Sequence, residues 1–328
     1  MMSRPGPLLA LLLLLSAALL VLGVSVGSTG FAWLHVDGGM AAQIVWEIRL
    51  PRSLGAWTAG ALLGLAGAIA QGLFRNPLAD PYLLGSASGA GLGVAASLGL
   101  FGSAITTSGW VHHLGLTGAA FLGCLLGVLL TLMLARGAEH SLRLLLAGVV
   151  VGVVLLAMMN LIMLMKADIM REMQAFMLGS TGLLGWSNFG LMAVALGVSL
   201  CVSLGSSRVL DALTLGEATA RSLGVRLGLM RVILIGAFAV ATGTAVAMAG
   251  LIAFVGLVAP HLVRNLCPTT HGRLLGLSAC TGGALLLAAD ILARWLTAPQ
   301  ELPVGIVTAI LGGVYLLYLM HRQGRAMS

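Results

Sequence analysis

The chain has 328 residues, of which 59% are hydrophobic and only 8% are charged. A soluble domain carries about 25% charged residues, so this composition excludes a chain that is covered by water-facing side chains. The net charge of +7 comes mostly from single arginines in short segments, not from a basic cluster. We therefore expect a membrane protein with the lipid bilayer as its surroundings and no nucleic-acid partner.

Long apolar runs predict how the chain crosses the membrane. Runs such as 8–26 and 114–134 contain no charged residue and are long enough to cross a hydrocarbon core of about 30 Å as helices. The 46 glycines suit such helices, because small residues let helix backbones approach closely within lipid. The pattern predicts an all-α polytopic membrane bundle of about ten transmembrane helices, forming a single domain over residues 1–328. The predicted spans are 8–30, 53–74, 83–105, 114–135, 142–165, 187–205, 229–250, 251–264, 274–296 and 303–320.

Two of these spans are unusual. Arg4 before the first run is also typical of a signal peptide, but the run is longer than the apolar core of such a peptide, so we expect a retained helix. The run 251–264 is too short to span alone, and we expect a tilted helix or one partly buried in protein.

The distribution of cations predicts the orientation. With ten spans and an internal amino terminus, five cations lie outside: Arg49, Arg52, Lys166, Arg171 and Arg294. The other twelve lie in the cytoplasm: Arg4, Arg75, Arg136, Arg143, Arg208, Arg221, Arg226, Arg231, Arg264, Arg273, Arg322 and Arg325. This bias agrees with the positive-inside rule, so we expect a multi-pass inner-membrane protein with both termini cytoplasmic.

The sequence offers no catalytic motif. A phosphate-binding loop needs GxxxxGK[ST], but Lys166 is the one lysine of the chain and follows a methionine-rich stretch. HExxH, GxSxG and clustered carboxylates do not occur either. We expect no enzyme activity, cofactor or metal site in this chain, so any ATP hydrolysis must come from a partner subunit.

Short polar and glycine-containing segments recur in a specific order along nearly the whole chain. They are Arg49-Leu50-Pro51-Arg52, Gly67 and Gln71, Arg75 to Pro81, Leu84-Gly85, Gly89-Ala90, Arg143 to Gly148, Gly216-Glu217, Ala220-Arg221, Leu223-Gly224, Gly250 to Arg264, Asp290, Arg294 and Glu301 to Gly305. In this order and spacing they resemble the FecCD-type permease family, the membrane subunits of siderophore, haem and cobalamin ABC importers. The chain departs from the family at Gly312 to Tyr315, where a proline is usual near Val314, so a kink in the last helix is in doubt.

The resemblance implies the permease of a type II ABC importer. Such a subunit moves a metal chelate (haem, an iron-siderophore or cobalamin) from the periplasm to the cytoplasm. It implies a homodimer with two ATP-binding subunits and one periplasmic substrate-binding protein.

Three arginines on the predicted outer face are candidates for docking that binding protein. Arg49 and Arg52 are three residues apart and can point the same way on a helix, and Arg294 lies one turn after Asp290, which can orient it. Guanidinium groups suit bidentate pairing with carboxylates, and the resemblance implies acidic partners on the binding protein. The alternative is that the arginines only anchor helix ends at the interface.

A polar segment on the predicted cytoplasmic face is a candidate for coupling to the ATPase. Residues 211–226, within a loop of about 206–228, are long enough for a short helix and have little apolar surface to bury. The resemblance implies a coupling helix that sits in a groove of the ATPase subunit; the alternative is an ordinary amphipathic loop. The residues matching the family here are Gly216, Glu217, Ala220, Arg221, Leu223 and Gly224.

Methionines are candidates for the wall of the translocation path. Seven of the sixteen fall between residues 158 and 177, and we assign Met159, Met163 and Met170 to the path. Methionine adapts to irregular apolar shapes. Met163, Met170 and Met177 are spaced by seven and would share a face if one helix continued that far, although generic packing explains the cluster equally well.

The competing interpretation is an autonomous secondary transporter or channel. Such proteins commonly carry an acidic residue within the membrane for ion or proton coupling. All ten acidic residues of this chain lie at or near the predicted helix ends, so no coupling acid is evident.

Overall fold

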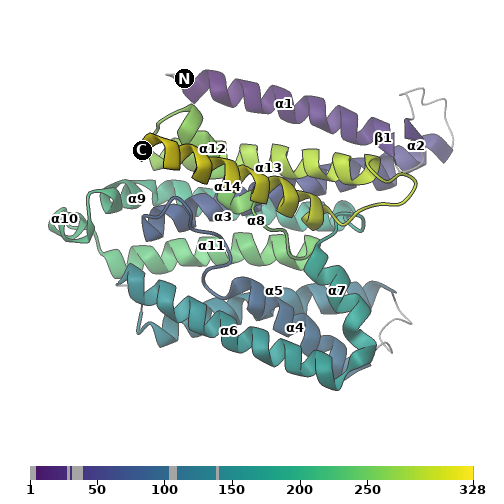
Figure 1. Ribbon diagram of the computed structural model, residues 1–328, viewed down its shortest axis with the longest axis horizontal. Coiled ribbons are helices and arrows are strands. Elements are labelled where there is room, and N and C mark those ends of the chain that lie inside the picture. Colours follow the sequence, from purple (N-terminus) through teal and green to yellow (C-terminus); the bar gives the residue numbers. More distant parts are fainter. Residues whose placement is uncertain (1–4, 28–29, 32–39, 103–108, 138–139, 328) are drawn as a thin grey trace.

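The computed structural model describes residues 5–27, 30–31, 40–102, 109–137 and 140–327 (Figure 1). Its helices confirm the predicted all-α membrane bundle, and each predicted span has a helix of its own. Eight helices of the described chain are long and apolar enough to cross a membrane, whereas α4 and α12 are shorter. The ten are α1 (Pro5–Ser25), α3 (Leu50–Phe74), α4 (Ser86–Phe101), α5 (Gly109–Leu134), α6 (Ser141–Met165), α8 (Trp186–Gly205), α11 (Leu227–Ala249), α12 (Val255–Leu266), α13 (His271–Trp295) and α14 (Val304–Met327).

Shorter elements connect these helices. A short helix α2 (Met40–Ile44) and a π-helix η1 (Val45–Arg49) lead directly into α3, so Arg49 and Arg52 lie on one continuous helical stretch. The remaining connections are β1 (Val26–Gly27) and β2 (Gly30–Phe31), which pair antiparallel, η3 (Ala167–Ile169) with α7 (Met170–Leu178), and α9 (Ser207–Thr214) with α10 (Glu217–Ser222).

Helix α3 is the centre of the bundle and is buried along most of its length. Glycines allow its neighbours to approach closely. A Cβ atom at Gly60 or Gly64 would overlap the backbone of α13 at Gly282 or Ser278, and one at Gly67 would overlap the carbonyl oxygen of Gly256 on α12. The predicted use of glycine for close helix packing therefore applies to the core itself.

A second group of helices packs beside this centre. Helices α4, α5 and α6 lie together on one side of α11, and α1 lies on the opposite side of the bundle along α13 (Figure 1). Helices α4 and α5 meet through facing glycines, since a Cβ atom at Gly89 would overlap the backbone of Gly123.

Two of the differences from the predicted spans have a visible structural cause. The first helix ends at Ser25 rather than at residue 30, because the chain turns into β1. The short eighth span begins its helix only at Val255: the N–H of Leu251 bonds to the carbonyl of Phe176 at 3.0 Å, and Phe254 has a positive φ of 69°. Residues 251–254 are thus held in non-helical backbone that is surrounded by protein, as expected for a short span.

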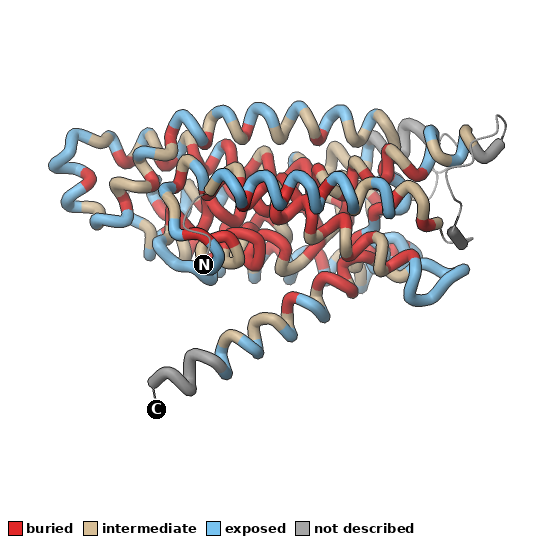
Figure 2. The backbone as a smooth tube through the Cα atoms, turned by 90° about the horizontal axis from the view of Figure 1, so that it is seen from above, coloured by how far each residue is buried: buried red, intermediate tan, exposed pale blue. Residues whose placement is uncertain are grey.

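The two ends of the bundle carry different elements. Helix α1 begins and α14 ends at the end that carries α9 and α10, whereas β1, α2 and α7 lie at the opposite end (Figure 1). Helix α14 runs unbroken through Val314. Its carboxyl-terminal half stands away from the body of the bundle (Figure 2).

Candidate functional site

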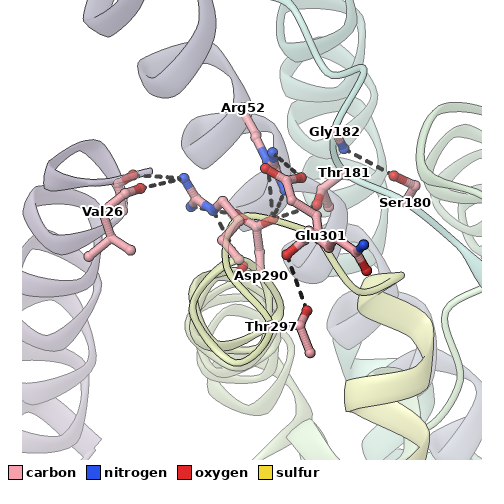
Figure 3. Close-up of polar contacts among 11 residues, drawn as sticks. Val26, Arg52, Ser180, Thr181, Gly182, Asp290, Thr297 and Glu301 are labelled. Atoms are coloured by element: carbon pink, nitrogen blue, oxygen red, sulfur yellow. Dashed lines mark hydrogen bonds and ion pairs between the residues drawn. The ribbon is translucent and has the colours of Figure 1, made fainter. Parts of the chain in front are cut away.

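A mostly buried network of charged side chains lies at the end of the bundle opposite α9 and α10. Arg52, in the first turn of α3, donates from Nε and Nη2 to Oδ1 of Asp290 on α13, at 3.2 and 3.0 Å. The Asp290 side chain is fully buried. Its Oδ1 also accepts from the hydroxyl of Thr181 at 2.5 Å, in the loop after α7. Figure 3 shows these side chains converging from α3, α13 and the Thr181 loop.

Arg294 extends the network to α1. Its Nη2 donates to Oδ2 of Asp290 at 2.6 Å, so the i,i+4 pair predicted from the sequence is present. Its Nη1 donates to the carbonyl oxygens of Gly23 and Val26, at 2.9 and 3.1 Å. The last carbonyl groups of a helix lack partners within the helix, and a guanidinium is a favourable donor to them. Arg294 therefore fastens the end of α1 to α13.

Arg49 makes a similar attachment. Its Nη1 lies 3.2 Å from the carbonyl oxygens of both Val24 and Ser25. The three arginines predicted to face a partner are thus mostly buried, with 9%, 8% and 2% of Arg49, Arg52 and Arg294 exposed. Each has a partner inside the chain, and docking by these arginines stays a prediction.

Glu301 is the member of the network nearest to solvent. Its Oε2 accepts from Nη1 of Arg52 at 2.8 Å, and one third (33%) of its side chain is exposed. From the sequence, Glu301 was expected only as part of a family motif, without a partner, and Thr181 was not predicted to take part. The signal that could have indicated the Glu301 contact is charge balance, because two arginines at one end of a membrane bundle need more than the single carboxylate of Asp290.

The predicted coupling segment forms two short helices at the other end of the bundle. Gly216 and Gly224 have positive φ values of 102° and 80°, which glycine adopts at little cost, and they bracket α10. Leu215 and Leu223 are 64% and 63% exposed on either side of α10. Ala220 is fully buried and points into this chain. Arg221, like Leu223 and Gly224, is exposed.

Polar contacts attach this segment to the long helices. Asp211 on α9 accepts from the N–H of His271 at 2.9 Å and lies 2.8 Å from its Nδ1, so it caps the beginning of α13. Glu217 accepts from Nη2 of Arg231 on α11 at 2.7 Å. Partial burial acts to raise the pKa of Glu217, but the hydrogen bond and charge of Arg231, with a hydrogen bond from Ser141, outweigh it and lower the pKa below its usual value.

The methionines predicted to line the path do not share one face. The chain breaks at Lys166 between α6 and α7, so the continuous helix that would align Met163, Met170 and Met177 does not form. Met159 is 2% exposed in a cluster with α4 and α5, and Met163 packs against the same cluster. Met170, on α7, is 50% exposed.

An apolar cavity lies where α7 meets α14. Its volume is about 410 Å³. Its lining comes from α7, from the non-helical stretch before α12, from the first turns of α14 and from the beginning of α4, and includes Met177, Leu178, Leu251, Ile306 and Tyr82. Met177, the last of the three methionines spaced by seven, thus lines this cavity.

No metal-binding group is evident in the part of the chain that the structure describes. No three His, Cys, Asp or Glu side chains come together there in a way that could hold an ion. The fully buried acid within a helix, Asp290, faces two arginines. Both oxygens of this carboxylate are thus occupied by guanidinium donors of the chain itself.

Comparisons with known proteins agree with this architecture. The sequence profile of the FecCD transport family matches residues 8–322. The vitamin B12 import system permease protein BtuC of Klebsiella pneumoniae subsp. pneumoniae is 42% identical over 297 residues, which cover 89% of this chain and 86% of that protein. The protein of the same name from Salmonella typhi is 40% identical over 318 residues, which cover 95% of each.

Solved structures show the same fold. An inward-facing conformation of an ABC transporter described as of the metal-chelate type superimposes with a TM-score of 0.87 at 27% identity, covering 97% of this chain and 100% of that one. PsaBC from Streptococcus pneumoniae, in complex with Fab, superimposes with a TM-score of 0.55 at 16% identity, covering 80% and 89%. The second likeness concerns the fold alone.

Proposed function

The chain belongs to the FecCD transport family, and from this premise we propose that it is the permease subunit of an ABC importer powered by a separate ATPase. The observation that carries the proposal is the helix pair α9–α10, which projects from one end of the bundle in a chain without a phosphate-binding loop. The exposed leucines beside α10, Leu215 and Leu223, would contact the ATPase subunit. Large exposed apolar side chains on a polar loop are typical of a protein contact.

The proposed substrate is a metal chelate, and cobalamin is the first candidate. Relatives named as vitamin B12 import permeases are about 40% identical over nearly the whole chain. The similar transporter of the metal-chelate type supports the broader class. Haem and iron-siderophores are the alternatives within that class.

The proposed assembly has two copies of this chain, two ATP-binding subunits and one periplasmic binding protein. Helix α14, whose far half stands away from the bundle (Figure 2), supports a second copy, because Ile310, Val314 and Leu317 are 61%, 61% and 68% exposed on it. The apolar cavity bordered by α7 and α14 would then face the space between the copies. We place the translocation path there, with Met177 in its wall rather than Met159.

In the proposed orientation α9, α10 and both chain ends lie in the cytoplasm of a multi-pass inner-membrane protein. The excess of arginine in the segments assigned to that side supports it. The network around Asp290 then lies toward the periplasm, where the binding protein would dock. An acidic residue of that protein would have to approach Arg52 from the side of Glu301, since Asp290 occupies the other edge of the guanidinium.

The experiment that tests the proposal is co-purification of the cognate ATP-binding subunit with variants of Leu223. We expect Leu223→Asp to lose most of the bound subunit, because a carboxylate would be desolvated in an apolar contact. Leu223→Met keeps the apolar area and is expected to retain it. Equal recovery of the ATP-binding subunit with wild type and Leu223→Asp would contradict the proposed contact.

A further inference from the structure

Arg231 is a buried cation near the cytoplasmic end of the bundle by the proposed orientation. It lies in the second turn of α11 and only 1% of the residue is exposed. Its Nη2 donates to Oε1 of Glu217 at 2.7 Å and to the hydroxyl of Ser141 at 2.9 Å. One guanidinium nitrogen thus joins the beginning of α10 to the beginning of α6.

Ser141 completes this contact. It is the first residue of α6, and its hydroxyl lies 3.1 Å from Oε1 of Glu217 and 3.3 Å from the carbonyl oxygen of Leu73. The single hydroxyl proton can serve one of these acceptors at a time. Leu73 is in the last turn of α3, so the ends of α3, α6, α10 and α11 meet at this group.

The contact is strong for physical reasons. A hydrogen bond between ionised groups is shorter and stronger than a neutral one, and burial reduces the screening by water. The lowered pKa of Glu217 keeps its carboxylate ionised at neutral pH. Because Arg231 is buried, removing the carboxylate of Glu217 would weaken the compensation of its charge where water screens it little.

We propose that Arg231 is the positioning residue that ties α10 to α6, so that a displacement of α10 is passed to the translocation path. This inference rests on the proposed function, in which α10 contacts the ATPase. Helix α6 leads through η3 into α7, and Met177 and Leu178 of α7 line the apolar cavity beside α14. Ser141 is therefore connected along the chain to this cavity through α6, η3 and α7.

A second attachment of the same segment provides a comparison. Asp211 on α9 holds the beginning of α13 through His271. Helix α13 belongs to the buried centre around α3, whereas α6 is mostly exposed on the outside of the described bundle. An element at the edge can move with less loss of packing than one in the core, which favours α6 as the element that moves.

The first test measures the attachment itself in the chain embedded in nanodiscs. Hydrogen exchange of the amides of residues 217–222 is compared between wild type, Arg231→Gln, Arg231→Lys and the control Arg273→Gln, which removes an exposed arginine from the first turn of α13. We expect exchange to rise about tenfold in Arg231→Gln, because hydrogen bonds to charged groups typically change an equilibrium by that factor or more. Arg231→Lys keeps the charge and should restore part of the protection, and the control should match wild type.

The second test measures transport in proteoliposomes that contain the complex with its ATP-binding subunit and binding protein. The readout is cyanocobalamin imported per ATP hydrolysed, which a loss of folded protein alone would not change. We expect the ratio to fall about tenfold in Arg231→Gln and to recover in part in Arg231→Lys. If Arg231→Gln does not assemble, Ser141→Ala removes the link to α6 without burying an unpaired charge, and its ratio should fall about threefold.

The outcomes separate the inference from the proposed function. Unchanged exchange in Arg231→Gln would show that Arg231 does not hold α10. Raised exchange with an unchanged import ratio would show that the attachment does not transmit movement, and either result overturns the inference. A wild-type complex that imports cyanocobalamin, haemin and a ferric siderophore no faster with ATP than without it would instead overturn the proposed function.

Discussion

Arg52 and Asp290 are 238 residues apart in the sequence, yet two nitrogens of Arg52 bond to the same carboxylate oxygen of Asp290. The pair joins the beginning of α3 to the last turns of α13, the two helices that form the core of the bundle. Arg294 occupies the other oxygen of Asp290 and holds the end of α1. One carboxylate therefore organises three helices at the end of the bundle that we assign to the periplasm.

We predict that Asp290→Asn destabilises the protein strongly. The variant keeps the shape of the side chain but leaves two guanidinium groups without their shared counterion, and breaking a buried ion pair typically costs about 3–5 kcal/mol. The apparent melting temperature of the purified chain in detergent measures the effect. Glu172→Gln, at an exposed acid of α7, is the matched control. Equal melting of the two variants would show that the network adds little to stability.

We predict that Glu301→Gln strengthens docking of the periplasmic binding protein. Glu301 neutralises the accessible edge of Arg52, so its removal frees that edge for an acidic residue of the partner. The expected gain in affinity is about three- to tenfold, the range given by one net hydrogen bond of about 0.5–1.5 kcal/mol. Binding of the cognate protein to the reconstituted complex measures it.

The dependence of this binding on salt is the second readout for Glu301. Exposed charge pairs are screened over about 8–10 Å at physiological ionic strength, so binding to the Glu301→Gln complex should weaken more steeply with salt. Glu47→Gln, which removes an exposed acid of η1 outside the network, is the control. Weaker docking in Glu301→Gln would indicate that Glu301 itself, and not Arg52, contacts the partner.

We predict that Asp80 makes stability depend on pH. Burial raises the pKa of Asp80 to about 6, although a hydrogen bond from the N–H of Tyr82 opposes the shift. The pKa in an unfolded chain is about 3.9, so between these values the folded state binds a proton that the unfolded state has lost. Stability contributed by this group is therefore gained as the pH falls from about 7 toward about 4, and it is lost as the pH rises through about 6.

The measurement compares wild type with Asp80→Asn. The melting temperature of wild type minus that of Asp80→Asn should increase as the pH falls from about 7.5 to about 5. These two pH values lie about one to two units above and below the Asp80 pKa of about 6. The exposed Asp168→Asn variant is the control and should follow wild type. A constant difference between wild type and Asp80→Asn across this range would rule out the shifted pKa.

The sequence predicted the elements of the fold well because membrane helices are specified locally. An uninterrupted apolar run is sufficient for a span, and the ten predicted spans each correspond to one helix. Gly216 and Gly224, which the resemblance singled out in the coupling segment, lie on either side of α10 with positive φ values that favour glycine. The sequence did not predict that the eighth helix begins only at Val255, because this late start depends on a hydrogen bond between Leu251 and α7.

Contacts between residues far apart in the sequence could not be predicted in the same way. The three outer arginines were assigned to an external partner, but their internal acceptors on α1 and α13 depend on how those helices pack. Arg231 was counted only as a cytoplasmic charge, although its place just inside an apolar span was a sign that it needs a buried counterion. The alignment of Met163, Met170 and Met177 on one face depended on a helix that continued across Lys166, whereas the chain breaks there.

We propose that this chain moves its substrate only when a partner hydrolyses ATP. The most direct measurement is uptake of radiolabelled cyanocobalamin into proteoliposomes that contain either the chain alone or the chain with its ATP-binding subunit and binding protein. We expect uptake by the complete complex with ATP, and none by the chain alone under an imposed proton or sodium gradient. Gradient-driven uptake by the chain alone would rule out strict dependence on ATP and would establish an autonomous secondary transporter.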